Sequence, residues 1–435
     1  SYTPTESAED ADLVVLNTCH IREKAKHKVL SRLGRLKELK EKNRNLKVAV
    51  AGCVAQAEGK KLLEQSSAID VLIGPGKIHE LPNLLSTQAK VGGQPMATGF
   101  AKDLKQFDAE RMSCQESAQQ ANPEGVEPAL QGKNEVSRFV NIQVGCDNFC
   151  TFCVVPFTRG REMSIPPTEI LTNTKKLLAQ GAKEITLLGQ NVNSYGKDLV
   201  RQARVAKTSD GPFVDLLREV AALPGLERLR FTTSNPHDMT APLAQLFAQQ
   251  PKLGAYYHLP LQSGSNKVLE EMRRKVTREQ YLQRVEWLRH ARPDIALSTD
   301  LIVGFPGESE EDFEQTLDLM RQVRFSFVFA FMYSKRKGTA AIRFRDQIPE
   351  EVKKARLQRL NQLQDKITLE LNHQEIGQQR EVLFLYPSNK EQHVYYGRTE
   401  HFRLVKVCSP RPLTGQLAHV EITHANKTAL EGRLL

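Results

Sequence analysis

Residues 137–335 alternate short apolar runs with longer segments of helical periodicity, and this alternation limits the folds open to the chain. Strands that alternate with helices form βαβ units and a parallel sheet. Polar and glycine-rich segments follow the apolar runs, at what would be the carboxyl ends of the strands, which form the active-site face of a βα barrel. We therefore predict a partial (βα)6 barrel. Its strands are expected at 139–144, 184–188, 226–232, 255–259, 295–303 and 325–332.

The first hundred residues repeat this pattern on a smaller scale. Apolar runs at 11–19, 47–53 and 69–73 alternate with helical patterns at 21–41, 56–65 and 78–85, which predicts an N-terminal α/β domain with a parallel sheet. Cys19 ends the first run and Cys53 ends the second, so both are expected at the carboxyl edge of the sheet, where ligands usually bind. Two ordinary buried cysteines are the alternative.

A third feature is the loop 145–162, which holds Cys146, Cys150 and Cys153 in a C-x3-C-x2-C spacing. Soft thiolate ligands suit zinc or an iron–sulfur cluster. Zinc usually takes four ligands in two separated pairs, whereas this trio has no obvious fourth partner. The spacing therefore favours a [4Fe-4S] cluster with one open iron, a catalytic arrangement. A zinc knuckle or three buried free thiols are the alternatives.

Composition narrows the class of protein. The chain has 40% hydrophobic and 26% charged residues, as soluble globular proteins do, and no apolar run long enough for a transmembrane helix. Its 7 cysteines are an odd number, which argues against a secreted disulfide framework and predicts a reducing, cytoplasmic location without membrane attachment. The formal charge of +10 fits a polyanionic partner such as RNA without requiring one.

The C-terminal end predicts a separate β module. A helical pattern at 352–371 precedes short strands, which suggest a small OB-like barrel. Within it, Arg398, Phe402 and Arg403 lie at a turn, where they would pair with phosphates and stack on a base; a solvated hairpin is the alternative. The polar composition of segment 101–136 predicts a linker or insertion. Cys114 within this segment is predicted to be an exposed thiol. The strands are expected at 381–386, 394–399, 403–407, 417–422 and 430–434.

The cysteine spacing, with Phe152 before the last cysteine, resembles the radical S-adenosylmethionine (SAM) superfamily. Three sequence motifs resemble the MiaB-type tRNA methylthiotransferases within this superfamily. They are Asn-Thr-Cys-His-Ile-Arg-Glu-Lys-Ala (17–25), Ala-Gly-Cys-Val-Ala-Gln (51–56) and Gly-Gln-Asn-Val-Asn-Ser-Tyr (189–195). This resemblance implies an N-terminal methylthiotransferase domain and an RNA-binding TRAM domain around the barrel. The expected domains are 1–100, the linker 101–136, the radical SAM barrel with its trailing helix at 137–375, and the TRAM domain at 376–435.

The resemblance also assigns roles to residues. Cys146, Cys150 and Cys153 would hold the catalytic [4Fe-4S] cluster, whose open iron binds SAM and cleaves it to a 5′-deoxyadenosyl radical. Cys19 and Cys53 match two of the three ligands of an auxiliary [4Fe-4S] cluster. The first of those three lies in a strand upstream of Ser1, so we expect the sequence to be truncated at its start. The SAM-binding residues would be Phe152, Gly189, Gln190, Asn191, Gln262, Asp300, Gly304 and Pro306.

The implied activity is that of a tRNA-2-methylthio-N6-isopentenyladenosine synthase, a transferase that inserts a methylthio group at C2 of the modified adenosine at position 37. The expected partners are tRNA, a flavodoxin- or ferredoxin-like electron donor, and sulfur- or cluster-donor proteins. One alternative is the same chemistry on another modified adenosine or on a ribosomal protein. The other is a non-catalytic iron–sulfur RNA-binding protein.

Overall fold

The computed structural model describes residues 2–5, 7–18, 23–91, 93–100 and 136–435, so Cys19, Cys114 and nearly all of the predicted linker lie outside the described residues. The chain forms two compact units. The first comprises residues 1–108, 145–162 and 336–339, and the second comprises the remainder. The cysteine loop therefore groups with the N-terminal residues, and each unit is described by itself.

The first unit is built on a parallel sheet in the order β1 (Leu13–Thr18), β2 (Lys47–Gly52), β3 (Val71–Ile73) and β4 (Met96–Ala97). Helix α1 (Glu23–Lys42) connects β1 to β2, and its Val29, Leu33 and Leu36 pack into a buried core with Val48 and Val50. A 3-10 turn, η1 (Pro75–Glu80), and helix α4 (Leu81–Val91) follow β3. The predicted βαβ domain is confirmed, and β4 is a strand that the sequence pattern did not indicate.

The single helix predicted at 56–65 is wrong in its bounds. The structure has two short helices, α2 (Cys53–Glu58) and α3 (Lys60–Gln65), which meet at Gly59. Gly59 has φ +53°, and such a left-handed backbone ends one helix and starts the next. Helix α2 begins directly at Cys53, so the cysteine is the first residue of a helix, and β2 ends one residue before it at Gly52.

The second unit contains the predicted partial barrel. Parallel strands pair as β5 (Ser137–Asn141), β8 (Glu184–Leu188) and β9 (Arg228–Phe231), and as β10 (Tyr256–His258), β11 (Ala296–Val303) and β12 (Phe327–Met332). A parallel bridge between Leu229 and Leu253 joins the two sets. All six predicted strands are therefore present, in sequence order around the barrel.

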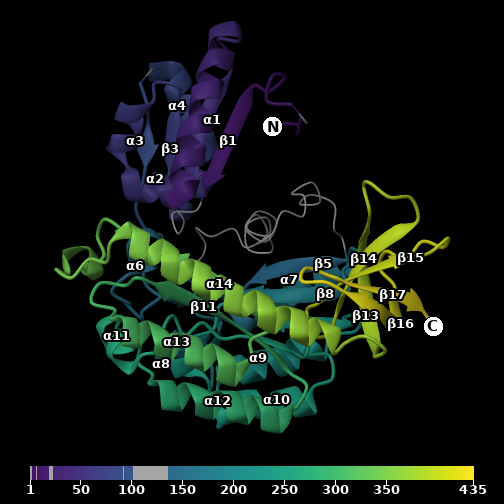
Figure 1. Ribbon diagram of the computed structural model, residues 1–435. Coiled ribbons are helices and arrows are strands. Elements are labelled where there is room, and N and C mark those ends of the chain that lie inside the picture. Colours follow the sequence, from purple (N-terminus) through teal and green to yellow (C-terminus); the bar gives the residue numbers. More distant parts are fainter. Residues whose placement is uncertain (1, 6, 19–22, 92, 101–135) are drawn as a thin grey trace. The chain divides into compact units, whose positions relative to one another are not determined.

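Helices cover the outer face of these strands (Figure 1). Phe213, Phe231, Phe247 and Tyr257 form a chain of edge-to-face and tilted ring contacts between strands and helices. Because side chains alternate along a strand, Arg230 and Tyr256 point the other way, into the barrel. The covering helices are α7 (Pro167–Ala179), α9 (Pro212–Ala221), α10 (Ala241–Gln249), α11 (Asn266–Glu271), α12 (Arg278–Ala291) and α13 (Glu310–Val323), with short elements η4 (Val192–Ser194), α8 (Lys197–Arg201), η5 (Pro236–Asp238) and η6 (Ala340–Arg343).

Helix α14 (Glu350–His373) lies along β12 and leads to the C-terminal module, shown in yellow-green in Figure 1. The module is a closed barrel of five strands in the order β13-β14-β15-β17-β16, as predicted, with a core that includes Val382, Phe384 and Val420. Its strands are β13 (Gln379–Pro387), β14 (Val394–Thr399), β15 (Leu404–Cys408), β16 (Leu417–Ala425) and β17 (Leu430–Leu434).

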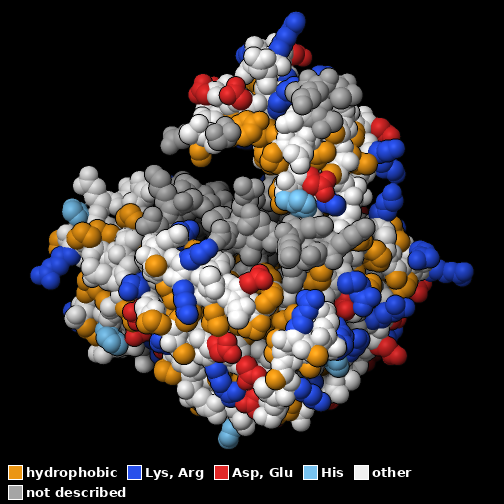
Figure 2. All heavy atoms as spheres, turned by 180° about the vertical axis from the view of Figure 1, so that it is seen from behind, with side chains coloured by type: hydrophobic (Ala, Val, Ile, Leu, Met, Phe, Trp, Pro, Cys, Tyr) orange, Lys and Arg blue, Asp and Glu red, His pale blue; other side chains and the backbone are white. Residues whose placement is uncertain are grey.

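The surface carries both signs of charge. On the face shown in Figure 2, lysine and arginine side chains lie interspersed with aspartate and glutamate. None of the helices in the described part of the chain is both long and apolar enough to span a bilayer.

Candidate active site

The cysteine loop is closed by the antiparallel pair β6 (Gln143–Val144) and β7 (Met163–Ser164), which stand before and after it in the chain. Gly145 opens the loop with φ +81°, and a Cβ there would lie 2.1 Å from the carbonyl oxygen of Arg161. Only glycine fits this close approach. The Cys146 N–H donates to the Gly160 carbonyl at 3.3 Å, which fixes the first cysteine of the trio.

All three cysteines are half-buried, and hydrogen-bond donors are directed at the sulfurs of Cys146 and Cys153. Asn148 Nδ2 donates to Cys146 Sγ at 3.4 Å, and the Val155 N–H donates to Cys153 Sγ at 3.5 Å. The Cys153 N–H donates to the Cys150 carbonyl at 3.0 Å, which bends the chain between these two ligands. Donors near the sulfur atoms are one means by which proteins tune iron–sulfur clusters.

The surroundings of Cys146 favour the protonated thiol while no metal is bound. Burial raises the pKa of the Cys146 thiol to about 11, and the neighbouring Cys150 adds to this effect, whereas Asn148 opposes it. A bound cation reverses this preference, because the metal holds the sulfur as a thiolate. The three sulfurs do not gather within 4.8 Å of one another as ligands of a single ion would; in the described part of the chain, only Asp294, Glu400 and His401 form such a group. The donor set therefore suits a cluster with one iron for each thiolate.

An exposed aromatic side chain stands beside the trio. Phe149 directly precedes Cys150, has φ +49° and is 41% exposed. The guanidinium carbon of Arg161 lies 5.8 Å from the centre of its ring. Asp147 holds that guanidinium through two hydrogen bonds of 2.7 and 3.0 Å. The loop therefore presents a ring and a cation together at its surface, whereas the predicted SAM contact Phe152 is half-buried.

Of the two N-terminal cysteines, the structure describes Cys53, which directly follows the carboxyl end of β2. Thr18 and Gly52, the residues before Cys19 and Cys53, are paired opposite each other in the β1–β2 register. Gly52 has φ +93°, and a Cβ there would clash with the backbone of Thr18. Cys53 is buried, and its helix α2 packs against α6 (Val155–Thr158), which begins shortly after Cys153. A role for Cys19 and Cys53 as cluster ligands stays a prediction, since Cys19 lies outside the described residues.

In the second unit, the carboxyl ends of β5 to β8 carry buried polar atoms without hydrogen-bond partners in the described chain. Asn141 Nδ2, Gln143 Oε1 and Asn191 Oδ1 are such atoms, in residues that are 6%, 1% and 2% exposed. Gly189 lies beside Gln143, since a Cβ on it would meet the Gln143 Cβ at 3.5 Å. Unpaired buried polar groups are rare in folded proteins and suit a polar ligand. Sequence reasoning named Asn191 but missed Asn141 and Gln143, two polar residues within an apolar run that leads into the cysteine loop.

Two predicted SAM-binding residues are neighbours, Gln262 in the segment after β10 and Asp300 on β11. The Gln262 N–H donates to the Asp300 carbonyl at 2.9 Å, and the Gln262 carbonyl accepts from the Ile302 N–H at 2.9 Å. Gln262 has φ +89°, a strained conformation for this residue, of the kind that concentrates at functional sites. The carboxylate of Asp300 lies 3.5 Å from His258 Nε2, and Asp300 is more exposed than His258. His237, by contrast, is exposed and bonded to the Lys275 carbonyl.

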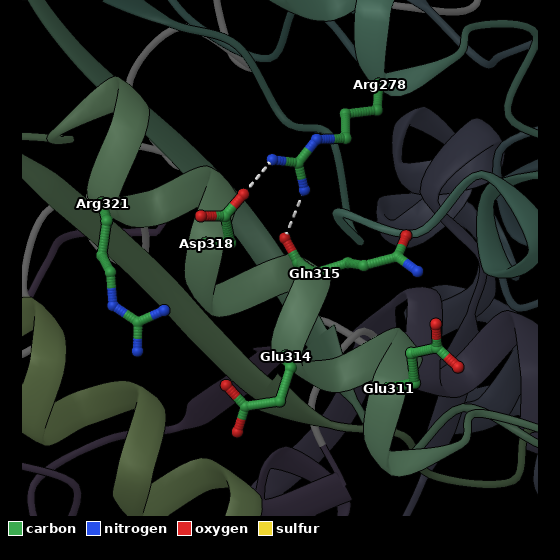
Figure 3. A pocket seen from close by; sticks show the side chains of 6 residues that line it. All are labelled: Arg278, Glu311, Glu314, Gln315, Asp318 and Arg321. Carbon is green, nitrogen blue, oxygen red and sulfur yellow. Dashed lines mark hydrogen bonds and ion pairs between the residues drawn. The ribbon is translucent and has the colours of Figure 1, made fainter.

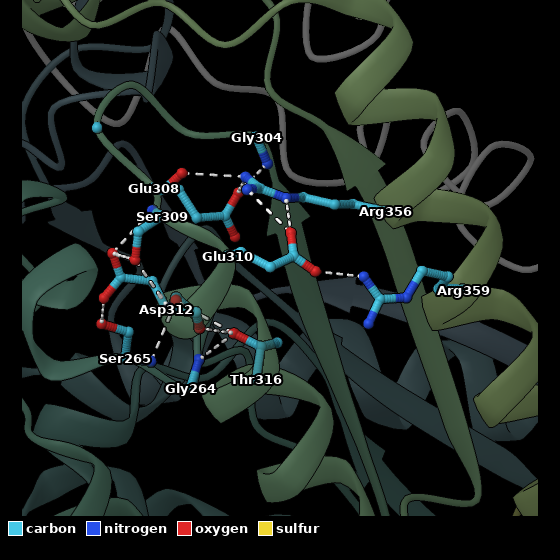
Figure 4. A network of polar contacts seen from close by, with 12 residues as sticks. Gly264, Ser265, Gly304, Glu308, Ser309, Glu310, Asp312, Thr316, Arg356 and Arg359 are labelled. Carbon is cyan, nitrogen blue, oxygen red and sulfur yellow. Dashed lines mark hydrogen bonds and ion pairs between the residues drawn. The ribbon is translucent and has the colours of Figure 1, made fainter.

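The predicted SAM-binding loop with Gly304 and Pro306 is held from α14 by a polar network (Figure 4). The carboxylate of Glu308 accepts from the Gly304 N–H, and Arg356 Nη1 donates to the same carboxylate at 3.1 Å and to the Glu308 carbonyl at 3.0 Å. Burial raises the pKa of Glu308 to about 7, although the charge of Arg356 opposes this shift. Asp312, which forms a capping box with Ser309 at the start of α13, also accepts a hydrogen bond from Ser265 at 2.7 Å. The network ties the loops after β10 and β11 together.

The turn predicted to bind RNA is instead packed inside the second unit. Arg398 Nη1 donates to the Phe402 carbonyl at 2.8 Å, and its guanidinium carbon lies 4.1 Å from the Phe402 ring centre. Arg403 pairs with Asn372 and Glu375, and its side chain is 13% exposed. Phe402 stacks on Tyr256 of β10. These side chains already have partners in the barrel and in the adjoining helix, and RNA binding by Arg398 and Arg403 stays a prediction.

One surface groove lies apart from these residues. Arg278, Glu311, Glu314, Gln315, Asp318 and Arg321 line it along α13 (Figure 3). Arg278 already pairs with Asp318 at 2.5 Å and donates to the Gln315 carbonyl at 2.6 Å. None of the predicted site residues lines this groove, which has the character of a solvated charged surface.

Comparison with known proteins agrees with the predicted radical SAM barrel and with the predicted N-terminal methylthiotransferase domain. Residues 140–320 match the model of the Radical SAM superfamily, and residues 1–74 match the Uncharacterized protein family UPF0004. The tRNA-2-methylthio-N(6)-dimethylallyladenosine synthase of Maricaulis maris is 44% identical over 436 residues, covering 100% of this chain and 91% of that protein. The enzymes of the same name from Geotalea uraniireducens and Rickettsia conorii are each 42% identical, covering 100% of this chain and 92% and 93% of their own lengths.

Among solved structures, the radical S-adenosylmethionine methyltransferase TsrM from Kitasatospora setae superposes with a TM-score of 0.51 at 16% identity, covering 85% of this chain and 69% of that one. At this identity the likeness concerns the fold alone. The full-length matches carry the assignment: the chain belongs to the tRNA-2-methylthio-N(6)-dimethylallyladenosine synthase family of radical SAM proteins.

Proposed function

We propose that this chain inserts a methylthio group at C2 of N6-isopentenyladenosine (N6-dimethylallyladenosine) at position 37 of tRNA. The observation that carries this proposal is the 44% identity to a synthase of that name over the whole chain. Relatives from other bacteria carry the same name at similar identity, which favours this reading over another modified adenosine or a ribosomal protein. The enzyme is a transferase, and its cofactors are [4Fe-4S] clusters and SAM.

The cluster and SAM supply a radical strong enough to take the hydrogen atom from an aromatic C2–H bond, which is too inert for acid–base chemistry. The chain supplies the ligands and the orientation. Cys146, Cys150 and Cys153 offer three thiolates, which leaves the fourth iron of a cluster free for SAM. The unpaired Nδ2 of Asn141 and Oδ1 of Asn191 offer a donor and an acceptor to a polar ligand, and their burial excludes water from it.

The surface of the cysteine loop suits an RNA substrate. A base that leaves its stack in a single-stranded loop is commonly held by an aromatic ring, with a cation nearby for the phosphate. Phe149 and Arg161 offer both groups next to Cys150. The turn with Arg398 and Arg403 does not, because its side chains are engaged within the chain.

The partners follow from this chemistry. Radical formation consumes an electron, so we propose a flavodoxin- or ferredoxin-like donor. Each turnover consumes a sulfur atom, so we propose a sulfur- or cluster-donor protein that replenishes the auxiliary cluster, held in part by Cys19 and Cys53. A cytoplasmic location is consistent with free thiols and a tRNA substrate.

Mass spectrometry of tRNA nucleosides from a deletion strain tests the proposal. We expect the 2-methylthio-N6-isopentenyladenosine pool to disappear and N6-isopentenyladenosine to accumulate. A wild-type copy should restore the pool, whereas a Cys146→Ala copy should not. An unchanged 2-methylthio pool in the deletion strain would exclude the proposed function and favour one of the alternatives.

A further inference from the structure

The C-terminal β barrel contributes an aromatic side chain to the interior of the partial barrel. Phe402 has φ +68°, and this backbone turns its ring onto Tyr256, with ring centres 4.9 Å apart and an angle of 24° between the planes. The guanidinium of Arg230 lies 5.0 Å from the Phe402 ring centre. Arg230 also donates to the carbonyls of Thr399 and Glu400 at 2.8 and 3.0 Å. The turn 399–402 is thus fixed by both backbone and ring contacts.

The arginine that holds this turn, Arg230, is also part of a buried ion pair inside the partial barrel. Arg230 Nε donates to Glu184 Oε2 at 2.7 Å, with both side chains at most 3% exposed. Arg228, two residues before on the same strand, donates to the Arg398 carbonyl at 2.8 Å. A buried ion pair keeps its geometry only where its remaining donors also find partners, and here the β module provides those partners. The position of Tyr256 therefore depends on the β module as well as on its own strand.

From Tyr256 a chain of polar contacts runs toward the carboxyl ends of the strands. Tyr256 Oη lies 2.6 Å from Ser298 Oγ, and Ser298 Oγ lies 2.8 Å from His258 Nδ1. The other ring nitrogen, His258 Nε2, faces Asp300 Oδ1 at 3.5 Å. Tyr256 and His258 are two residues apart on β10, and Ser298 and Asp300 are two apart on β11, so all four share the inner face. His258 is buried, and an edge of its ring meets Phe329 of β12.

The contacts between Tyr256, Ser298 and His258 favour one arrangement of hydrogen-bond donors and acceptors. If Tyr256 donates to Ser298, the serine hydroxyl donates in turn to His258 Nδ1, and the neutral imidazole carries its proton on Nε2, toward Asp300. The opposite direction would place a lone pair of Nε2 against the carboxylate, which is repulsive. The hydroxyls thus select the tautomer in which His258 presents a donor to Asp300.

We propose that His258 is a positioning residue that orients the carboxylate of Asp300 in the barrel. Its tautomer is set by Ser298 and Tyr256, and Phe402 holds Tyr256 in place by stacking on its ring. This inference rests on the proposed function and on the predicted role of Asp300 in binding SAM. The β module then serves the SAM site, because its turn supports Tyr256, the first member of the chain of contacts.

The first test needs no variant. Long-range 15N–1H spectra of histidine-labelled protein report the tautomer of each ring, and the spectrum of a His258→Gln variant assigns the signal of His258. We expect the Nε2–H form in the wild type. A predominant Nδ1–H form would overturn the proposal.

The second test removes one hydroxyl and keeps the ring that stacks on Phe402. For Tyr256→Phe we expect the His258 tautomers to become mixed and the Kd for SAM, measured anaerobically on the reconstituted full chain, to rise about three- to tenfold. The Kd for tRNA should not change. Tyr281→Phe is the matched control, because it removes a buried hydroxyl that donates to the Leu259 carbonyl on the helix side of the barrel; it should alter neither the tautomer nor the affinity for SAM.

A Tyr256→Phe protein with unchanged SAM affinity and an unchanged His258 signal would contradict the proposal. An effect of equal size in Tyr281→Phe would reduce the role of Tyr256 to general packing and also contradict it. Failure of the proposed function would look different, since wild-type protein would then bind SAM without methylthiolating isopentenylated tRNA.

Discussion

The ring of Phe402 stacks on the ring of Tyr256 at a centre-to-centre distance of 4.9 Å, so the C-terminal barrel and the partial barrel share an aromatic contact. Two arginines enclose the same ring, Arg398 from its own module and Arg230 from β9. Cation–π pairs of this kind stabilise more strongly when they are shielded from water. The contact makes Phe402 a structural link between the two parts of the second unit.

Phe402→Ala should therefore destabilise the full chain. We expect a loss of about 3 kcal/mol in the free energy of unfolding of this unit, from lost burial and lost cation–π contacts, measured by urea denaturation. Phe149→Ala is the control, because that side chain is 41% exposed and should change stability by less than about 0.5 kcal/mol. Equal effects of the two substitutions would contradict a buried role for Phe402.

Arg403→Gln should affect stability more than tRNA binding. The Arg403 side chain is 13% exposed and faces Glu375 at 3.4 Å, whereas the control Arg433 is 72% exposed. Loss of a hydrogen-bonded charge costs about 2 kcal/mol, which thermal or urea unfolding would detect. The slope of the logarithm of the tRNA-binding constant against the logarithm of salt concentration should be the same for Arg403→Gln as for the wild type. If the substitution removed a phosphate contact, that slope would fall by about 1. A reduced slope with unchanged stability would restore the original RNA-binding assignment.

Most of the architecture could be predicted because it depends on local pattern. The apolar runs that become β8, β11 and β14 alternate with helical periodicity or follow turn residues, and these signals act over a few residues. The mutual position of the turn with Phe402 and the strand with Tyr256 depends on contacts between residues far apart in sequence. Arg398 and Phe402 have the composition of an RNA-binding turn, and no local signal distinguishes a ring that stacks on a base from one that stacks on Tyr256.

The cysteine loop of the candidate site could also be predicted from local sequence, whereas the buried polar residues beside it could not. The spacing of Cys146, Cys150 and Cys153 identifies a metal loop by itself, since few other structures need three thiols so close together. The unpaired polar atoms of Asn141 and Gln143 can be recognised only in the structure. The sequence shows a polar residue in a strand, but it does not show whether that residue is buried or which hydrogen bonds it makes. The helix break at Gly59 was missed because a glycine can also lie within a helix.

Glu308→Gln should change how stability depends on pH. Burial raises the pKa of Glu308 to about 7, above its ordinary value of 4.5, although Arg356 opposes the shift. A carboxyl with a raised folded-state pKa contributes stability that is fully present below the unfolded pKa and is lost as pH rises through the folded one. Between pH 5 and 7.5 the melting temperature of the wild type should therefore fall more steeply than that of Glu308→Gln. Parallel curves for the two proteins would show that Glu308 does not titrate in this range.

Iron content separates the two cluster sites. Each [4Fe-4S] cluster contains four irons, so the reconstituted full-length wild type should hold about eight irons per chain and Cys146→Ala about four. Cys408→Ala is the control, because Cys408 is an exposed thiol on the β module and its loss should leave iron content unchanged. About eight irons in Cys146→Ala would mean that Cys146 is not required as a ligand, and about four in the wild type would leave the auxiliary site empty.

The most direct test of the whole account is the reaction of the purified, reconstituted protein with SAM, a reductant and tRNA that carries N6-isopentenyladenosine. Mass spectrometry of the hydrolysed tRNA should show 2-methylthio-N6-isopentenyladenosine, formed together with 5′-deoxyadenosine, and both should be absent with Cys146→Ala. Unmodified N6-isopentenyladenosine in a wild-type reaction that does produce 5′-deoxyadenosine would contradict the assigned substrate. Absence of both products from a protein with full iron content would contradict the radical chemistry itself.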